Sequence, residues 1–494
     1  MIVDWKPALA EARSALALGD ARRARRALSA ADLDPDAPDE ALKLLARALR
    51  SLGETAAALP LLERVARRQP GSAIAEHNLA AALGDAGRQA DSEAAARRAI
   101  AKGGSAPETR LILARALLAQ GDLDEAEVWF RRALDLRGDF LPAVRDLSQL
   151  VWMRSGDLSR TLAVLEPLKA LAESREDAAI LRASILRDTA GDDAALASLV
   201  PWLESGSVEV LLAAAAAASG VDPQRALVHA RNALTRAPGD PRAGIALAAA
   251  LVATDQAPEA ATLLEGLLDR DPGHQHARAL LYTAWRMMAD PRALTSADYA
   301  RLVRVFPLDP LPDLDRLSRT AEALRALHPF KAHPFQQSVS AGSQSFIDPR
   351  TAGDPDINQL FRSLEPAIDS YLAEAAPAWE GSPGGTAWRM SGAWSVRLRA
   401  GGRHTDHVHP RAWVSSAVYI VTPGPSKPGS REGWLRFGAA PVGNGRNLPA
   451  EYWVRPEAGT VVLFRSCLWH GTEPFTGPGE RLTVAFDLQP GTTS

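Results

Sequence analysis

Side chains that could hold a metal ion gather in one short segment near the end of the chain. The segment 403–410 contains four of them, His404, Asp406, His407 and His409. A further histidine, His470, lies far downstream. Imidazole and carboxylate ligands suit ferrous iron, and a site with only three protein ligands leaves positions open for a co-substrate and dioxygen. The pattern therefore predicts a metal site built from two distant segments.

Two different ligand pairs can be drawn from the upstream segment. Residues two apart on a strand point to the same face, so His404 can act with Asp406, and His407 can act with His409. On a continuous strand the two pairs face opposite ways, and only one of them can bind the metal. With His470, the first pair gives two histidines and a carboxylate, which the chemistry of ferrous iron favours. The second pair gives three histidines.

The region around these residues has the pattern of short β-strands. Apolar residues alternate with polar ones, and Gly/Pro turns separate the segments. We expect strands at 387–398, 413–422, 433–437, 451–454, 460–466 and 481–488. Short strands at this spacing predict an antiparallel sandwich or barrel. The interval from His407 to His470 covers several strands, which is long enough for the chain to return beside its start.

The first part of the chain is periodic. Turn positions recur every 34 or 35 residues, at Gly19, Gly53, Gly87, Gly121, Gly156 and Gly191, and again at Val221 and Asp255. After Gly121, the residues Ala126, Phe130 and Ala133 share one face of a helix. Such a period indicates stacked helix pairs. The pattern resembles the tetratricopeptide repeat, in about eight units over residues 5 to 290, which implies an all-α superhelix with a groove that recognises a peptide or protein.

Prolines crowd the segment after the repeats, and this segment separates two predicted domains. We expect a repeat domain over 1–290, a connector over 291–334 with one helix near 314–327, and a β-rich domain over 335–494. A helix is also expected over 356–376, where Pro377 would end it.

Several motifs of the β-rich part resemble those of a bacterial group of 2-oxoglutarate/iron(II) oxygenases. They are the segments 392–398, 406–410, 413–419, 459–466, 469–472 and 481–487. The resemblance covers about residues 328 to 490 and implies a double-stranded β-helix, or jelly roll. In that group the His-x-His-Pro element recurs, so the resemblance implies His407, His409 and His470 as metal ligands and leaves the pair of His404 and Asp406 as the alternative.

The same resemblance implies the cofactors and the reaction. Iron(II) and 2-oxoglutarate would be the cofactors, with Arg481 on the distal carboxylate of 2-oxoglutarate, because a guanidinium forks a carboxylate in a way that lysine cannot. Thr483 lies two residues on, on the same face, and Tyr419 is a weaker cofactor-binding candidate. No catalytic residue is expected beyond these ligands. The implied reaction is hydroxylation of a protein or peptide that the repeats recruit.

Two other functions fit the same residues. One is a non-catalytic interaction scaffold that keeps an oxygenase-like domain. The other is a three-histidine metal dioxygenase that does not use 2-oxoglutarate. Formation of succinate separates the last from the leading hypothesis.

Composition narrows the setting of the protein. The chain has 494 residues and a formal net charge of −3, so no basic excess points to nucleic acid or to an anionic membrane. There is one cysteine, Cys467, and hence no disulfide within the chain. The N-terminus lacks a signal-peptide pattern. We expect a cytoplasmic protein and no membrane or nucleic-acid partner.

Overall fold

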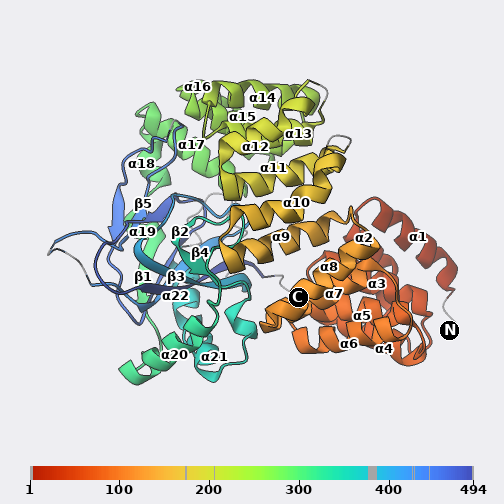
Figure 1. Cartoon of the computed structure of the whole chain (residues 1–494). Coiled ribbons are helices and arrows are strands. Elements are labelled where there is room, and N and C mark those ends of the chain that lie inside the picture. The colour runs from red at the N-terminus through yellow and green to blue at the C-terminus, as the bar shows by residue number, and fades with distance from the viewer. Residues whose placement is uncertain are drawn as a thin grey trace. The chain divides into compact units, whose positions relative to one another are not determined.

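The computed structural model describes residues 4–172, 175–204, 206–375, 387–424, 427, 429–443 and 445–491 (Figure 1). The chain divides into two compact units, Met1–Leu150 and Val151–Ser494. The first holds helices only, and the second holds further helices and the sheets. The division into 1–290, 291–334 and 335–494 stays a prediction.

The first unit consists of antiparallel helix pairs. They are α1 (Trp5–Ala17) with α2 (Ala21–Ala27), α3 (Asp39–Ser51) with α4 (Thr55–Arg68), α5 (Ala73–Asp85) with α6 (Gln89–Ala101), and α7 (Pro107–Gln120) with α8 (Leu123–Leu136). The turn glycines Gly19, Gly53, Gly87 and Gly121 all have positive φ, a conformation that side chains with a Cβ rarely adopt. The buried face of α8 is Ala126, Phe130 and Ala133, as the spacing predicts.

Helices of the same kind follow along the chain, and the first of them, α9, begins in the first unit and ends in the second. They are α9 (Leu141–Ser155), α10 (Leu158–Ala172), α11 (Glu176–Ala190), α12 (Asp192–Leu199), α13 (Val208–Ala218), α14 (Pro223–Arg236), α15 (Pro241–Ala253), α16 (Ala257–Arg270) and α17 (Gln275–Met287). Asp255 takes the positive φ that the period assigns to this position. The repeats thus form an all-helical array of the tetratricopeptide type (Figure 1). Among the described residues, every helix is too short or too polar to cross a lipid bilayer.

The β-rich part is built from two antiparallel sheets. The larger has the order β1-β7-β4-β9-β3-β2 and the smaller the order β6-β5-β8. Their bounds are β1 Val303–Pro307, β2 Val339–Gln344, β3 Trp388–His404, β4 Val414–Val421, β5 Leu435–Phe437, β6 Tyr452–Val454, β7 Thr460–Arg465, β8 His470–Thr472 and β9 Arg481–Pro490. This is the arrangement of a jelly-roll domain, and its two sheets enclose the predicted site residues.

Two strands escape the sequence pattern. Strand β1 lies inside the predicted connector and pairs with β7 at the edge of the large sheet, with Val305 opposite Val462. Strand β8 has three residues, too few for an alternation to be visible. The predicted connector therefore contributes a strand to the barrel.

The helices between β1 and β3 follow the prediction in part. Helix α20 (Leu314–Ala326) confirms the helix expected near 314–327. The helix expected over 356–376 is instead two, α21 (Pro355–Arg362) and α22 (Glu365–Ala375). Pro366 explains the break, because it has no N–H to donate to the carbonyl of Arg362. Residue 376 and Pro377 lie outside the described residues.

The last long repeat helix, α17, packs directly on the barrel. The indole Nε1–H of Trp469 donates to the carbonyl of Ala279 at 3.1 Å and to Oγ1 of Thr283 at 3.0 Å. Nε of Arg286 lies 3.1 Å from the carboxylate of Glu451. The neighbour of His470 is therefore held by a repeat helix.

Candidate metal centre

Backbone hydrogen bonds fix the two histidine-bearing segments side by side. The N–H of His407 donates to the carbonyl of His470 at 3.0 Å, and the N–H of His470 donates back to the carbonyl of His407 at 3.0 Å. The N–H of His409 donates to the carbonyl of Ser466 at 3.1 Å. Strand β3 ends at His404, so the segment that follows is a loop and not the continuous strand that the alternation argument assumed.

Three imidazoles converge in this frame. One ring nitrogen from each of His407, His409 and His470 lies within 4.8 Å of the other two. Nδ1 of His407 lies 2.8 Å from the carbonyl of Thr405, and Nδ1 of His470 lies 2.9 Å from the carbonyl of Leu468. A carbonyl only accepts, so each of these Nδ1 atoms carries the hydrogen and each Nε2 keeps its lone pair.

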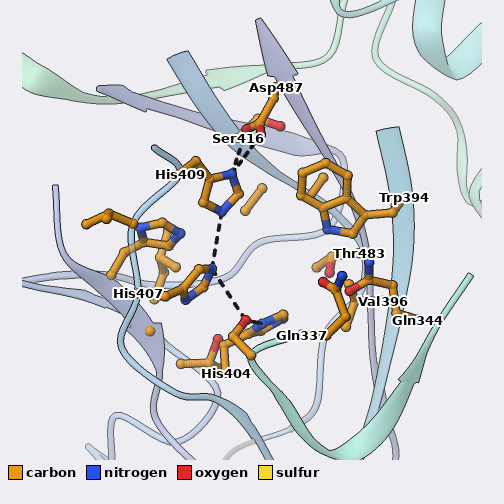
Figure 2. Close-up of a pocket in the computed structure, with 18 of the residues that line it drawn as sticks. Gln337, Gln344, Trp394, Val396, His404, His407, His409, Ser416, Thr483 and Asp487 are labelled. Carbon is orange, nitrogen blue, oxygen red and sulfur yellow. Dashed lines mark hydrogen bonds and ion pairs between the residues drawn. The ribbon is translucent and has the colours of Figure 1, made fainter. Parts of the chain in front are cut away.

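The contact between two of the rings indicates a cation site. Nε2 of His407 and Nε2 of His409 lie 3.2 Å apart (Figure 2). Two imidazole lone pairs at this separation repel unless a proton or a metal ion lies between them. Two ligands at right angles on a metal with bonds of about 2.1 Å are about 3 Å apart. The residues present therefore fit a divalent ion.

Burial keeps two of the imidazoles, those of His407 and His470, neutral. Desolvation, with the neighbouring His409, lowers the pKa of His407 to about 3. Desolvation, with the neighbouring His407 and His409, holds the pKa of His470 well below its usual value. Because a metal binds the neutral imidazole, no proton has to leave these two rings at neutral pH.

A carboxylate supports the third histidine from behind. Both oxygens of Asp487 lie close to Nδ1 of His409, at 2.7 and 2.9 Å (Figure 2). Oγ of Ser415 donates to Asp487 at 2.8 Å and is itself 2.8 Å from Oγ of Ser466. A carboxylate in this position fixes the tautomer of a ligating histidine and makes it more basic. Asp487 thus places a negative charge behind His409, on the side of the ring away from the cation site.

The alternative ligand pair is split in the structure. The carboxylate of Asp406 is 1% exposed and binds the guanidinium of Arg436 at 2.6 and 3.0 Å and the amide of Asn447 at 2.9 Å. It is absent from the lining of the pocket that holds the three imidazoles. His404 does line this pocket, and its Nδ1 lies 2.9 Å from Oγ of Ser338. Asp406 therefore serves an ion pair, and His404 stands beside the cluster.

Replacement of Asp487 and of Asp406 by asparagine should affect two different properties, metal binding and stability. We expect Asp487→Asn to weaken divalent-metal binding about 10- to 100-fold, because His409 loses its anionic partner, with little change in melting temperature. Asp406→Asn should lower stability by about 2 kcal/mol, because charge-assisted hydrogen bonds are lost, with metal affinity unchanged. Calorimetric titration with Co(II) and thermal melts measure both. A loss of metal binding in Asp406→Asn alone would instead identify Asp406 as a ligand.

The opposite wall of the pocket comes from alternate residues of β9. Residues two apart on this strand face the cavity, namely Arg481, Thr483, Ala485 and Asp487. Val396 of β3 lies opposite Thr483, and Gln344 of β2 lies opposite Val396, so Gln344 faces the same space (Figure 2). The cavity has a volume of about 470 Å³, enough for a small dicarboxylate beside a metal ion.

Among the residues that the structure describes, no carboxylate pairs with the buried cation Arg481. It is 2% exposed, and its Nε has no hydrogen-bond partner among the described residues. Nη1 of Arg481 donates a long hydrogen bond to Oγ1 of Thr483, at 3.5 Å, and its guanidinium carbon lies 5.0 Å from the centre of the Tyr419 ring. A buried charge is costly unless it is paired, so this arrangement favours an anionic ligand in the pocket.

The predicted cofactor-binding residues thus occupy different positions. Arg481 and Thr483 line the cavity with the three imidazoles. Tyr419 is fully buried outside the lining, with its ring against Arg481 and its hydroxyl without a partner among the described residues. Sequence reasoning missed the role of Asp487. The same period of two that places Thr483 on the face of Arg481 could have found it.

Family models match most parts of this architecture. Residues 392–487 match the family described as "Putative 2OG-Fe(II) oxygenase". Two tetratricopeptide-repeat models match residues 9–73 and 77–139, and residues 216–282. No curated protein sequence matches the chain.

Solved structures resemble parts of the chain at low identity. Yeast Tom70 is 16% identical over 61% of this chain and 67% of its own, with a TM-score of 0.45. A Pseudomonas putida prolyl-4-hydroxylase is 15% identical over 40% of this chain and 98% of its own, with a TM-score of 0.28. MamA is 20% identical over 33% of this chain and 96% of its own, with a TM-score of 0.29.

Proposed function

Because the chain combines tetratricopeptide repeats with a C-terminal domain of the 2OG-Fe(II) oxygenase family, we propose that it is an iron(II)- and 2-oxoglutarate-dependent hydroxylase of a protein or peptide. One observation carries this proposal. Three convergent imidazoles and a buried, unpaired arginine line the same cavity.

The roles of the residues follow from their chemistry. Nε2 of His407, His409 and His470 would hold the iron, and Arg481 would bind the distal carboxylate of 2-oxoglutarate with help from Thr483. When bound, iron(II) and 2-oxoglutarate supply oxidation by dioxygen, in which one oxygen atom enters a substrate C–H bond, the other enters succinate, and carbon dioxide leaves. Burial of His470 and Arg481 would keep water away from these two side chains.

The protein substrate is proposed from the repeats. Stacked helix pairs present an extended surface, and arrays of this type serve protein–protein contacts. Helix α17 joins this surface to the residue that precedes His470, through the hydrogen bonds of Trp469. A substrate recruited by the array would therefore arrive beside the cavity. The expected cytoplasmic location stays a prediction.

Anaerobic titration of the full chain with Fe(II) and 2-oxoglutarate tests the function. We expect a weak visible absorption band when both are present, because the keto acid chelates the iron. Admission of oxygen should then convert 2-oxoglutarate to succinate, measured by mass spectrometry. A protein that binds neither compound, or that forms no succinate, is not this enzyme.

A three-histidine dioxygenase that does not use 2-oxoglutarate is the second candidate. The absence of a carboxylate from the set of His407, His409 and His470 favours it. The unpaired charge of Arg481 favours the first candidate, because such an enzyme has no dicarboxylate to bind. Oxygen consumption without succinate would reverse this choice.

A further inference from the structure

A second cavity lies on the repeat helices, close to the metal centre. It has a volume of about 420 Å³ and is formed by α13, α15 and α17 with the barrel residue Pro410. On α15 the spacing of Ile245, Ala246 and Ala249 places all three on the cavity face. Leu212 and Ala216 continue this apolar surface on α13. The part of the array nearest the barrel thus offers an apolar groove.

This groove and the cavity that holds the imidazoles share one lining residue. Pro410 lines both, and it directly follows His409. On α17, His276 lines the groove, and its ring meets the edge of Trp469 at a centroid distance of 6.4 Å. Trp469 precedes His470. An occupant of the groove would therefore touch Pro410, which follows His409, and His276, which contacts the residue before His470.

The groove also carries unused hydrogen-bonding groups. No partner is recorded for the ring nitrogens of His276 among the described residues, and burial lowers its pKa to about 4, so the ring is neutral and can both donate and accept. Ser219 also lines the groove, as does Arg242, whose guanidinium is paired with Asp240 and Glu209. A peptide backbone needs such partners along its length, whereas an acyl chain does not.

We propose that this groove of α13, α15 and α17 binds an extended, apolar segment of the polypeptide substrate and delivers the adjoining residue past Pro410 to the metal centre. The proposal rests on the hydroxylase function proposed above and names the substrate class. The three helices are neighbours. Packed helices lie about 8 to 10 Å apart, so the groove spans roughly 16 to 20 Å. An extended chain rises about 3.3 Å per residue, so the segment has about five or six residues.

Peptides of defined flanks test the groove. Each peptide is labelled with fluorescein, has 15 residues and carries a central proline, asparagine or aspartate. A six-residue flank is placed either before or after this centre. The apolar flank consists of leucine, valine and alanine, and the polar flank consists of serine and glutamate. Binding is measured by fluorescence polarisation to the full chain, loaded anaerobically with Fe(II) and 2-oxoglutarate. We expect at least one apolar flank to bind about tenfold more tightly than its polar counterpart.

A matched pair of variants tests whether the peptide binds in the groove. Ile245→Glu puts a carboxylate into the apolar surface and should weaken binding of the apolar flank by about tenfold or more. Val228→Glu makes the same kind of change at an exposed position of α14 that does not line the groove, and should leave binding unchanged. Equal affinity for the two flanks, or an Ile245→Glu variant that binds like wild type, overturns the proposal.

Two further results are informative. If hexadecanoate binds and Ile245→Glu abolishes that binding while the peptides do not compete, the groove takes an acyl chain and the proposal fails. Succinate formation by the wild-type protein separates this proposal from the function. If succinate forms but the two flanks bind equally, only the proposal for the groove is rejected. If the apolar flank is preferred but no succinate forms, the proposed hydroxylase function is rejected.

Discussion

Replacement of His470 by alanine should abolish specific binding of Fe(II), whereas the same replacement of His404 should not. Both side chains line one cavity. Only His470 belongs to the convergent set, whereas His404 turns its Nδ1 to Oγ of Ser338. Loss of a partner that merely supports a ligand costs about 10- to 100-fold in metal affinity. Loss of a ligand should exceed the upper end of this range.

Two controls keep this result interpretable. His470 packs against Phe464, with ring centroids 4.6 Å apart, so its removal opens space in the core. Melting of the metal-free variant is therefore measured together with binding. His409→Ala removes a less buried member of the set, and it should lose the metal as well. Retention of Fe(II) by both variants, or its loss in His404→Ala, contradicts the proposed ligand set.

Arg481→Leu should remove the response to 2-oxoglutarate and leave Fe(II) binding intact. Truncating one member of a buried charge pair costs about 2 to 5 kcal/mol, so affinity for 2-oxoglutarate should fall by about 30-fold or more. The ligand-free variant should not be less stable than wild type, because it no longer buries an unpaired charge. Calorimetric titration and melts with and without 2-oxoglutarate measure both effects.

Arg411 offers the matched comparison. It lines the same cavity but is exposed, and its charge is therefore screened by water. Arg411→Leu should change affinity for 2-oxoglutarate by less than about threefold. If Arg481→Leu destabilises the ligand-free protein and leaves 2-oxoglutarate binding unchanged, Arg481 is a structural residue.

The sequence alone predicts the repeats and most strands, because their signals are local and periodic. Gly19 and its equivalents recur at the turn where a positive φ is needed, and Asp255 keeps this conformation without being glycine. Strands β4, β7 and β9 were expected within two residues of their observed ends. Strand β8, with three residues, has no period to detect.

The site could be predicted only up to the choice between two ligand pairs. Residues two apart share a face only if the segment after Arg403 is a continuous strand, whereas β3 ends at His404. The choice depends on contacts between distant segments. The backbone of His407 pairs with that of His470, and Arg436 forms an ion pair with Asp406. Neither contact can be deduced from the spacing of the residues within 403–410. The ligand roles themselves remain a proposal.

The contact of α17 with the barrel limits how the molecule can be taken apart. A fragment starting at residue 335 would lack the acceptors on Ala279 and Thr283 that hold the indole of Trp469, and it would lack β1, which covers the edge of β7. An uncovered strand edge invites pairing with other chains. The β-rich part is therefore not expected to be stable when it is separated from α17 and β1. Truncations intended to isolate it should retain α17 and everything that follows.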